Sequence, residues 1–266
     1  MMAELNNNTT LYHGEPNGPS LTVIAALLEK QVEADFVRID LAAGERHSMQ
    51  CEHGVEIDMS IEGEGPVLVV DGEAMADSVF LAVYLDDVGS GPALRPADPL
   101  KRWETMMWCR QIIERVAPAA AFLGTRAHLA GKLGALNDGQ FEGITSRIRS
   151  ADLRVRWEKI RAGDYPADQV ADSQTKIAQA VQKVEARLAD GREWLMEEFT
   201  IADLETYAWL AGMAVDLPEA FADAPLTGAW LARVKARPSV ERALSLAAHG
   251  DPRTSWAPGP EINRWG

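Results

Sequence analysis

The sequence is poor in cysteine and in basic residues, and it contains no long apolar run. Its two cysteines, Cys51 and Cys109, lie far apart and show no metal-ligand spacing. No stretch reaches the roughly 18 consecutive apolar residues that predict a transmembrane helix. The polar, asparagine-rich start lacks the form of a signal peptide. These absences predict a protein of the reducing cytoplasm, without a metal site and without a membrane span.

Acidic residues outnumber basic ones by 40 to 26, which gives a formal net charge of -14. Such a charge argues against binding to nucleic acid or to anionic membrane surfaces. The hydrophobic content of 47% over 266 residues is that of an ordinary globular protein with one or two domains.

The most informative stretch runs from Gly65 to Ser78. Residues 67–70 form a continuous apolar run that is typical of a buried strand. The following Asp-Gly pair favours a tight turn, so residues 73–76 are expected to return as the second strand of a hairpin. Asp77 and Ser78 are good capping residues, and the apolar residues after them predict a helix.

The residues before this stretch predict a strand, a helix and a second strand. Residues 9–13 read as the first strand, residues 20–30 carry apolar positions at helical spacing, and residues 34–39 alternate as a strand does. Together with the hairpin and its helix they complete a βαβ-ββα order. The fold class expected is α/β plus all-α, with a thioredoxin-like domain first.

The order Gly-Pro, strand, Asp-Gly, strand, acid-Ser, helix resembles the glutathione-binding half of glutathione S-transferases. In that family a cis peptide precedes the proline, here Pro66. The resemblance implies that the backbone of Gly65 pairs with the cysteinyl part of glutathione, and that Asp77 and Ser78 bind its γ-glutamyl end. A helix N-terminus offers free N–H groups and partial positive charge to a carboxylate. A plain hairpin followed by a capped helix remains the alternative.

The group that activates the thiol stands, in that family, near the end of the first strand or the start of the first helix. The candidates here are Ser20 and Asn17, and the alternative is that Ser20 only caps the helix and Asn17 belongs to a loop. A hydrogen bond to the thiolate would lower the pKa of the thiol. In the bacterial β-etherase branch an Asn precedes the Ser, whereas this chain has Pro19, which has no side-chain donor.

The segment 94–102 matches this β-etherase branch, whose members cleave β-aryl ethers of lignin, and helical patterns follow it. The domains expected are a thioredoxin-like domain over 9–88, a linker over 89–99, an all-α domain over 100–248 and an extended tail over 249–266. If Trp256 and Trp265 of the tail are buried, they dock on the domain or on a partner.

Within the helical domain we expect one helix over 101–117 that breaks near Pro118. Its residues Met107, Trp108 and Arg110 are candidates for a groove that holds an aromatic substrate. Core packing for the first two and solvation for the arginine are the alternatives. Further on, Thr200 and Asp203 form a capping pair before an apolar run.

The loop over 44–58 departs from the family pattern and could be a lid or a partner contact. It contains His47, Cys51 and His53, whose spacing fits no zinc site. Glu62 and Glu64 flank the place where an anionic tripeptide should lie, and each either points to solvent or weakens glutathione binding.

The resemblance implies glutathione-dependent cleavage of β-aryl ethers in lignin-derived aromatic ketones. The chain would act alone or as one subunit of a homodimer or heterodimer. A second interpretation is a catalytically silent subunit that supports an active paralogous partner, and a third is a scaffold protein. A chain active by itself should bind glutathione, whereas a supporting subunit should need its partner.

Overall fold

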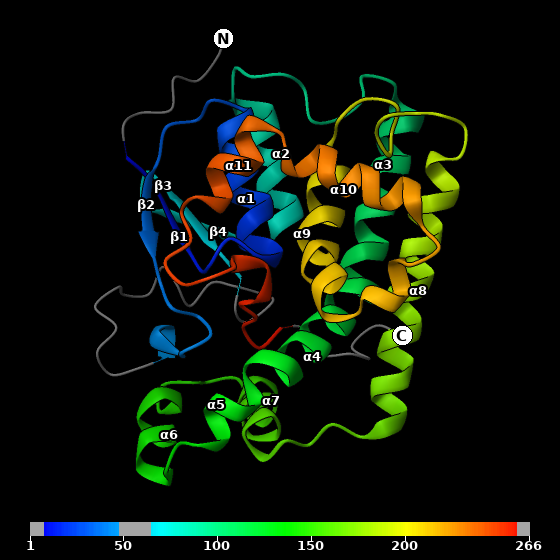
Figure 1. Ribbon diagram of the computed structural model, residues 1–266. Helices are drawn as coiled ribbons and strands as arrows, with labels where there is room; N and C mark the ends of the chain where they lie inside the picture. The colour runs from blue at the N-terminus through cyan, green and yellow to red at the C-terminus, as the bar shows by residue number, and fades with distance from the viewer. Residues whose placement is uncertain (1–7, 48–64, 260–266) are drawn as a thin grey trace.

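A mixed sheet of four short strands forms the N-terminal part of the computed structural model, which describes residues 8–47 and 65–259 (Figure 1). The strands are β1 (Thr9–His13), β2 (Asp35–Arg38), β3 (Val67–Val70) and β4 (Glu73–Ala76). Their order is β2-β1-β3-β4, with β1 parallel to β2 and antiparallel to β3. The hairpin of β3 and β4 pairs Val67 with Ala76 and Val70 with Glu73, which confirms the expected antiparallel hairpin.

Two helices complete this thioredoxin-like half, and a side chain caps each of them. Helix α1 (Gly18–Glu29) begins after Asn17, whose Oδ1 accepts a hydrogen bond of 3.0 Å from the Gly18 N–H. Helix α2 (Ser78–Val88) begins after Asp77, whose Oδ1 accepts bonds from two backbone N–H groups at 3.0 Å. Helix α1 is buried along most of its length because the sheet, α2, α9 and α11 surround it.

The rest of the described chain is helical. Its helices are α3 (Pro99–Gln111), α4 (Ala117–His128), α5 (Ala130–Gly134), α6 (Asp138–Thr145), α7 (Ala151–Ala162), α8 (Ala167–Leu188), α9 (Ile201–Asp216), α10 (Pro225–Lys235) and α11 (Pro238–Leu244). Helix α9 is buried almost all round and contacts α1, α3 and α4. It therefore joins the two halves of the molecule. In the described residues no helix combines the length and apolar character needed to cross a bilayer.

The expected helix break near Pro118 is wrong. A π-turn, η3 (Ile112–Val116), connects α3 to α4, and Pro118 lies in the first turn of α4. The N–H of Ala117 bonds to the carbonyl of Ile112, five residues earlier. This wider turn lets the helical path continue past a residue that has no N–H and whose ring would clash in a regular helix.

Residues 129–165 form a small helical unit with its own apolar cluster, at the bottom of Figure 1. The part of the unit after residue 136 divides into two helices, α6 and α7. Asn137 caps α6 in a capping box with Gln140, and Ser150 then caps α7 by accepting a bond of 3.3 Å from the Leu153 N–H. The cap at Ser150 therefore begins a separate helix, α7.

The capping box that starts α9 is confirmed. Asp203 accepts from the Thr200 N–H at 3.0 Å, and the Thr200 hydroxyl accepts from the Ala202 N–H at 3.2 Å. The other carboxylate oxygen of Asp203 accepts from the Leu195 N–H and from the Trp230 indole. Burial raises the pKa of Asp203 to about 6. The box thus fixes α9 to the loop before it and to α10.

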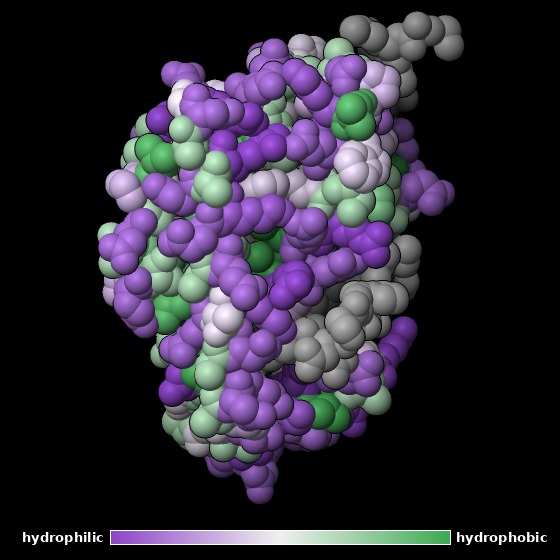
Figure 2. Space-filling view, turned by 90° about the vertical axis from the view of Figure 1, so that its right-hand side faces the viewer, coloured by the Kyte–Doolittle hydropathy of each residue, from purple (hydrophilic) through white to green (hydrophobic). Residues whose placement is uncertain are grey.

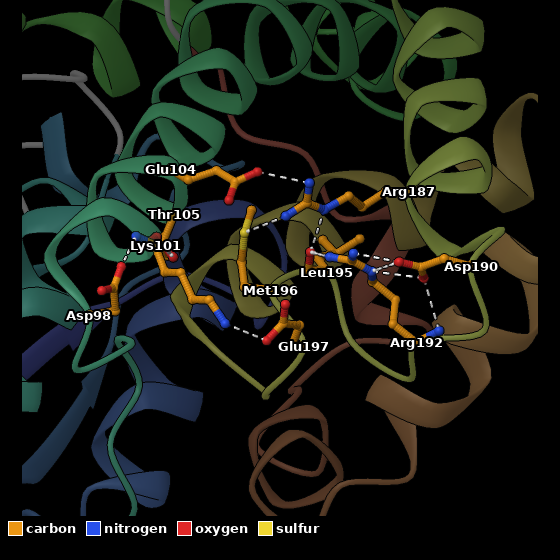
Figure 3. A network of polar contacts seen from close by, with 10 residues as sticks. All are labelled: Asp98, Lys101, Glu104, Thr105, Arg187, Asp190, Arg192, Leu195, Met196 and Glu197. Carbon is orange, nitrogen blue, oxygen red and sulfur yellow. Dashed lines mark hydrogen bonds and ion pairs between the residues drawn. The ribbon is translucent and has the colours of Figure 1, made fainter.

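A set of ion pairs holds that loop (Figure 3). Arg187 of α8 and Arg192 both donate to the carbonyl of Leu195. Lys101 of α3 pairs with Glu197 at 2.6 Å. The start of α9 is therefore tied to α3 and α8. The face that includes α8 is covered largely by hydrophilic residues (Figure 2), because the apolar stripe of α8 faces inward.

Candidate functional site

A cavity of about 50 Å³ lies where β1 ends and α1 begins. Five parts of the chain line it: the connection from β1 with the first turn of α1, the residues after β2, Gly65 shortly before β3, α9, and the C-terminal segment. The lining residues are Gly14, Glu15, Asn17, Gly18, Pro19, Ser20, Asp40, Leu41, Ala42, Gly65, Trp209, Ser255, Trp256, Ala257, Pro258 and Gly259. The structure thus brings together Ser20, Asn17 and Gly65, three of the site residues expected from the sequence.

Ser20 lies in the first turn of α1 and is 2% exposed. Its Oγ accepts a hydrogen bond of 3.0 Å from the Gly14 N–H. None of the described residues accepts the proton of its hydroxyl. The group therefore has its oxygen held in place and its proton available to a ligand. The free N–H groups and partial positive charge of the helix start also favour an anion at this point.

Asn17 caps α1 and also contacts the C-terminal segment. Its Oδ1 accepts from the Gly18 N–H, while its Nδ2 donates to the carbonyls of Arg253 and Ser255, both at 3.2 Å. Both the acceptor and the donors of this side chain therefore have partners. In this conformation Asn17 has no amide hydrogen left for a thiolate.

The peptide bond before Pro66 is trans, since no cis peptide occurs in the described residues. The expected cis bond is wrong for this structure, and trans is the intrinsically favoured isomer of an X–Pro bond. Gly65 nevertheless lines the cavity, and both Gly65 and Pro66 are buried.

Asp77 and Ser78 lie at the start of α2 and do not line this cavity. Burial raises the pKa of Asp77 although two N–H groups bond to its carboxylate. The Ser78 hydroxyl donates to Oε1 of Glu205 at 3.3 Å and is directed into the protein. The structure therefore separates the pair from the Ser20 cavity.

Glu205 on α9 is a buried acid that the sequence analysis missed. It is 0% exposed, and burial raises the pKa of its carboxyl to about 7. Its Oε1 accepts from Ser78 and, at 2.8 Å, from the indole of Trp209. The signal in the sequence was a carboxylate beyond the capping box, inside the apolar run of α9, where a solvated residue is out of place.

Trp209 forms the floor of the cavity. A Cβ placed on Gly18 would lie 3.2 Å from its ring, and Gly18 has a φ of +50°. A glycine therefore suits the position on both counts: backbone conformation and space. Trp256 of the tail stacks on the Trp209 ring, with 6.1 Å between the ring centroids and 27° between the ring planes. The expectation that a buried Trp256 docks on the domain is confirmed.

Met107, Trp108 and Arg110 are not brought to this cavity. Trp108 is buried among α3, α8 and α9, where its indole donates to Thr206 at 2.9 Å and the Lys183 ammonium lies over its ring. Arg110 is exposed and pairs with Glu114 at 2.6 Å. Met107 is half-buried, and it lines neither this cavity nor the second cavity between α4 and α7.

A second cavity, of about 250 Å³, lies between α4, α7 and the connection from α7 to α8. Phe122 and Tyr165 meet edge to face in its wall, with ring centroids 4.8 Å apart. Lys159 and Asp164 supply charged groups at its rim. Pro258 and Gly259 line both this cavity and the first, so the C-terminal segment separates the two.

The chain is similar to known proteins along nearly its whole length. It is 27% identical over 252 residues to Protein LigF of a Sphingobium species, which covers 91% of this chain and 95% of LigF. The crystal structure of β-etherase LigF superposes with a TM-score of 0.80 at 26% identity, over 90% of this chain and 99% of that one. A glutathione S-transferase of Silene vulgaris is 26% identical over 90% of this chain and 98% of its own length. The chain thus resembles the glutathione S-transferases over nearly its whole length. Among them it resembles the β-etherase branch.

A glutathione transferase family member of Pseudomonas fluorescens shares the fold of this chain. Its crystal structure, solved with two glutathione molecules bound, has a TM-score of 0.63 at 20% identity, over 91% of this chain and 94% of that one. No protein-family model matches the sequence.

Several expectations from the sequence concern residues outside the described ranges. Cys51, His53, Glu62 and Glu64 are among them, as is Trp265. His47 is described in a short turn over Glu45–His47 and is buried. Within the ranges 8–47 and 65–259, no group of three or more histidine, cysteine or acidic side chains is arranged to hold a metal ion.

Proposed function

We propose that the chain is a glutathione-dependent enzyme that cleaves β-aryl ether bonds next to a ketone in lignin-derived aromatic compounds. The observation that carries the proposal is Ser20, a buried serine in the first turn of α1 that lines a cavity and whose Oγ accepts a hydrogen bond from the Gly14 N–H. Its position is that of a group that can donate to a thiolate and keep it ionised near neutral pH. The similarity to a β-etherase along nearly the whole chain supports the choice of reaction.

In the proposed reaction the glutathione thiolate attacks the carbon that bears the aryloxy group. A carbon–sulfur bond forms, the carbon–oxygen bond breaks, and the electron pair leaves on the phenolate. The work of the protein is to hold the thiolate, orient the ether for in-line attack and exclude water. Ser20 would hold the sulfur, the backbone of Gly65 and Pro66 would bind the cysteinyl part, and Asp77 with Ser78 would bind the γ-glutamyl end.

The second cavity is our candidate site for the aromatic substrate. It is on the scale of small-molecule sites, is lined by the Phe122 and Tyr165 rings and borders the first cavity at Pro258 and Gly259. Flat apolar walls suit an aryl ring. In that case the aromatic substrate would not contact Met107, Trp108 or Arg110.

The purified chain with glutathione and a guaiacyl β-ether ketone tests the proposal, with release of the phenol as the readout. We expect turnover by the wild type and a loss of about 100-fold in kcat for Ser20→Ala, the scale seen when one oriented donor is removed. Ser245→Ala, which changes an exposed serine on another helix end, should retain full activity. Equal activity of Ser20→Ala and wild type would contradict the role of Ser20.

The second candidate is a catalytically silent subunit that supports an active paralogous partner. Pro19 in place of the asparagine of the branch, and the engagement of Asn17 by the tail, favour it. Under this proposal the chain alone is inert, and co-expression with a paralogous transferase-like chain yields an active mixed dimer.

We propose a dimer in either case, as homodimer or heterodimer. Phe80 on α2 and Trp103 on α3 are 66% and 60% exposed, which is unusual for aromatic side chains of this size and favours burial by a partner. Light scattering on the wild type and on Phe80→Ser tests this proposal. We expect a dimer that weakens on substitution, whereas a monomeric wild type would contradict it.

A further inference from the structure

The C-terminal segment over 251–259 crosses the cavity in which the thiol of glutathione would have to lie. In Figure 1 it is the red segment between α1 and α4. Five of its residues, from Ser255 to Gly259, line the cavity around Ser20. We infer that this segment is a strap that occupies part of the glutathione site in the free protein, and that glutathione must displace it to bind. The inference rests on the proposed function.

The size of the cavity is the first argument. With the strap in place, about 50 Å³ remains beside Ser20. A buried water needs roughly 10–15 Å³ on this measure, so the space suits a few waters. Small-molecule sites hold roughly 300–1,000 Å³. The space left beside Ser20 is therefore far smaller than a site for a tripeptide while the strap lies there.

The second argument is that the strap takes the polar groups a ligand would use. Asn17 Nδ2 donates to the carbonyls of Arg253 and Ser255, two backbone groups of an extended peptide. Arg156 of α7 donates to the carbonyl of Gly259 at 2.6 Å. The strap thus binds as a short peptide would. When it leaves, the amide hydrogens of Asn17 become available beside Ser20.

The third argument is the shape of the surface on which the strap packs, formed by α9 and α4. A Cβ on Gly212 of α9 would lie 2.2 Å from the carbonyl oxygen of Arg253 and 2.6 Å from the ring of Trp256. A Cβ on Gly124 of α4 would lie 2.3 Å from the same ring. Real Cβ atoms do not come so close, so any larger residue at either position would force the strap away.

One buried polar group of the strap also lacks a hydrogen-bond partner in this position. The indole Nε1 of Trp256 is buried without a hydrogen-bond partner among the described residues, although the side chain is only 3% exposed. A buried donor without a partner opposes docking. Beyond a short turn, η5 (Pro252–Thr254), the segment adds no helix and no strand to the fold. Docking is therefore held by side-chain contacts and a few hydrogen bonds to backbone carbonyls, with no regular backbone pairing, and a ligand can compete with it.

Binding of glutathione to three full-length proteins, measured by calorimetry, tests the inference. Gly212→Ala should displace the strap and bind glutathione about tenfold more tightly than wild type, because the competing segment is gone. Gly228→Ala is the matched control, since a Cβ on that α10 glycine meets nothing within 4 Å. Trp256→Ala, which removes the main anchor of the strap, should act like Gly212→Ala if the latter folds poorly.

Trypsin cleavage after Arg253 reports the position of the strap independently. We expect cleavage of the wild type to accelerate several-fold when glutathione is saturating, and Gly212→Ala to be cleaved fast without it. Tight binding with no change in cleavage, or equal affinities of all three proteins, would overturn the strap and leave the proposed function standing. Absence of glutathione binding by wild type and every variant would instead overturn the proposed function, and the strap with it.

Discussion

The indole of Trp209 donates a hydrogen bond of 2.8 Å to the buried carboxyl of Glu205, one turn earlier on α9. The same carboxyl oxygen accepts from Ser78 at the start of α2. Trp209 in turn forms the floor of the Ser20 cavity. One acid therefore links the helix start expected to bind the γ-glutamyl end with the wall of the cavity expected to hold the thiol.

Glu205→Gln should change how stability depends on pH. Burial raises the pKa of Glu205 from the usual 4.5 to about 7, so the folded protein holds this proton more tightly than the unfolded chain does. The stability that comes from the protonated acid is complete below pH 4.5 and is lost as the pH rises through 7. Glutamine stays neutral and keeps the acceptor that serves Ser78 and Trp209.

Urea unfolding at pH 5 and pH 8 checks this prediction. Relative to wild type, Glu205→Gln should gain about 1–3 kcal/mol of unfolding free energy between the two pH values. Glu198→Gln, an exposed position just before α9, should show no such gain. A constant difference across the range would mean that Glu205 does not titrate there.

Ser20→Ala should raise the pKa of bound glutathione's thiol, because the donor that stabilises the thiolate is lost. Thiolate absorbance near 240 nm, followed against pH in the complex, measures it directly. Ser20→Thr keeps a hydroxyl and should restore part of the effect. If the thiol titrates alike in wild type and Ser20→Ala, another group activates it.

Phe122→Ala should raise the KM for the aromatic ether about tenfold and leave the KM for glutathione unchanged. The reason is that it removes one ring of the edge-to-face pair in the second cavity and none of the groups around Ser20. Steady-state kinetics with each substrate varied in turn separates the two. Leu226→Ala, at a partly exposed apolar position on α10, is the control. A rise in the glutathione KM alone would place the aromatic site elsewhere.

Thr200→Ala should lower the free energy of unfolding by about 1–2 kcal/mol, since it removes one half of the buried capping box of α9. Chemical denaturation measures the loss. Thr175→Ala on the exposed face of α8 should cost less, because its hydroxyl bonds only to a carbonyl of its own helix. If both substitutions lower the free energy of unfolding equally, the capping box adds no more stability than an ordinary hydroxyl bond within a helix.

The sequence by itself determined the local elements. The four strands, the capping of α2 by Asp77 and the box at Thr200 all follow from periodicity and from side chains that bond to N–H groups two or three residues away. These interactions lie within a few residues of one another and leave a direct trace in the pattern. For that reason they could be predicted without coordinates, and so could the place of Ser20 at the start of α1.

Only the tertiary structure decided what fills the site. Asn17 meets the carbonyl of Arg253 across 236 positions of the chain, and no local pattern encodes such a contact. Tertiary packing also put Trp108 into the core and buried Glu205 against Ser78. Burial and long-range pairing depend on how whole helices pack, so the same residue types would serve equally well on a solvated face.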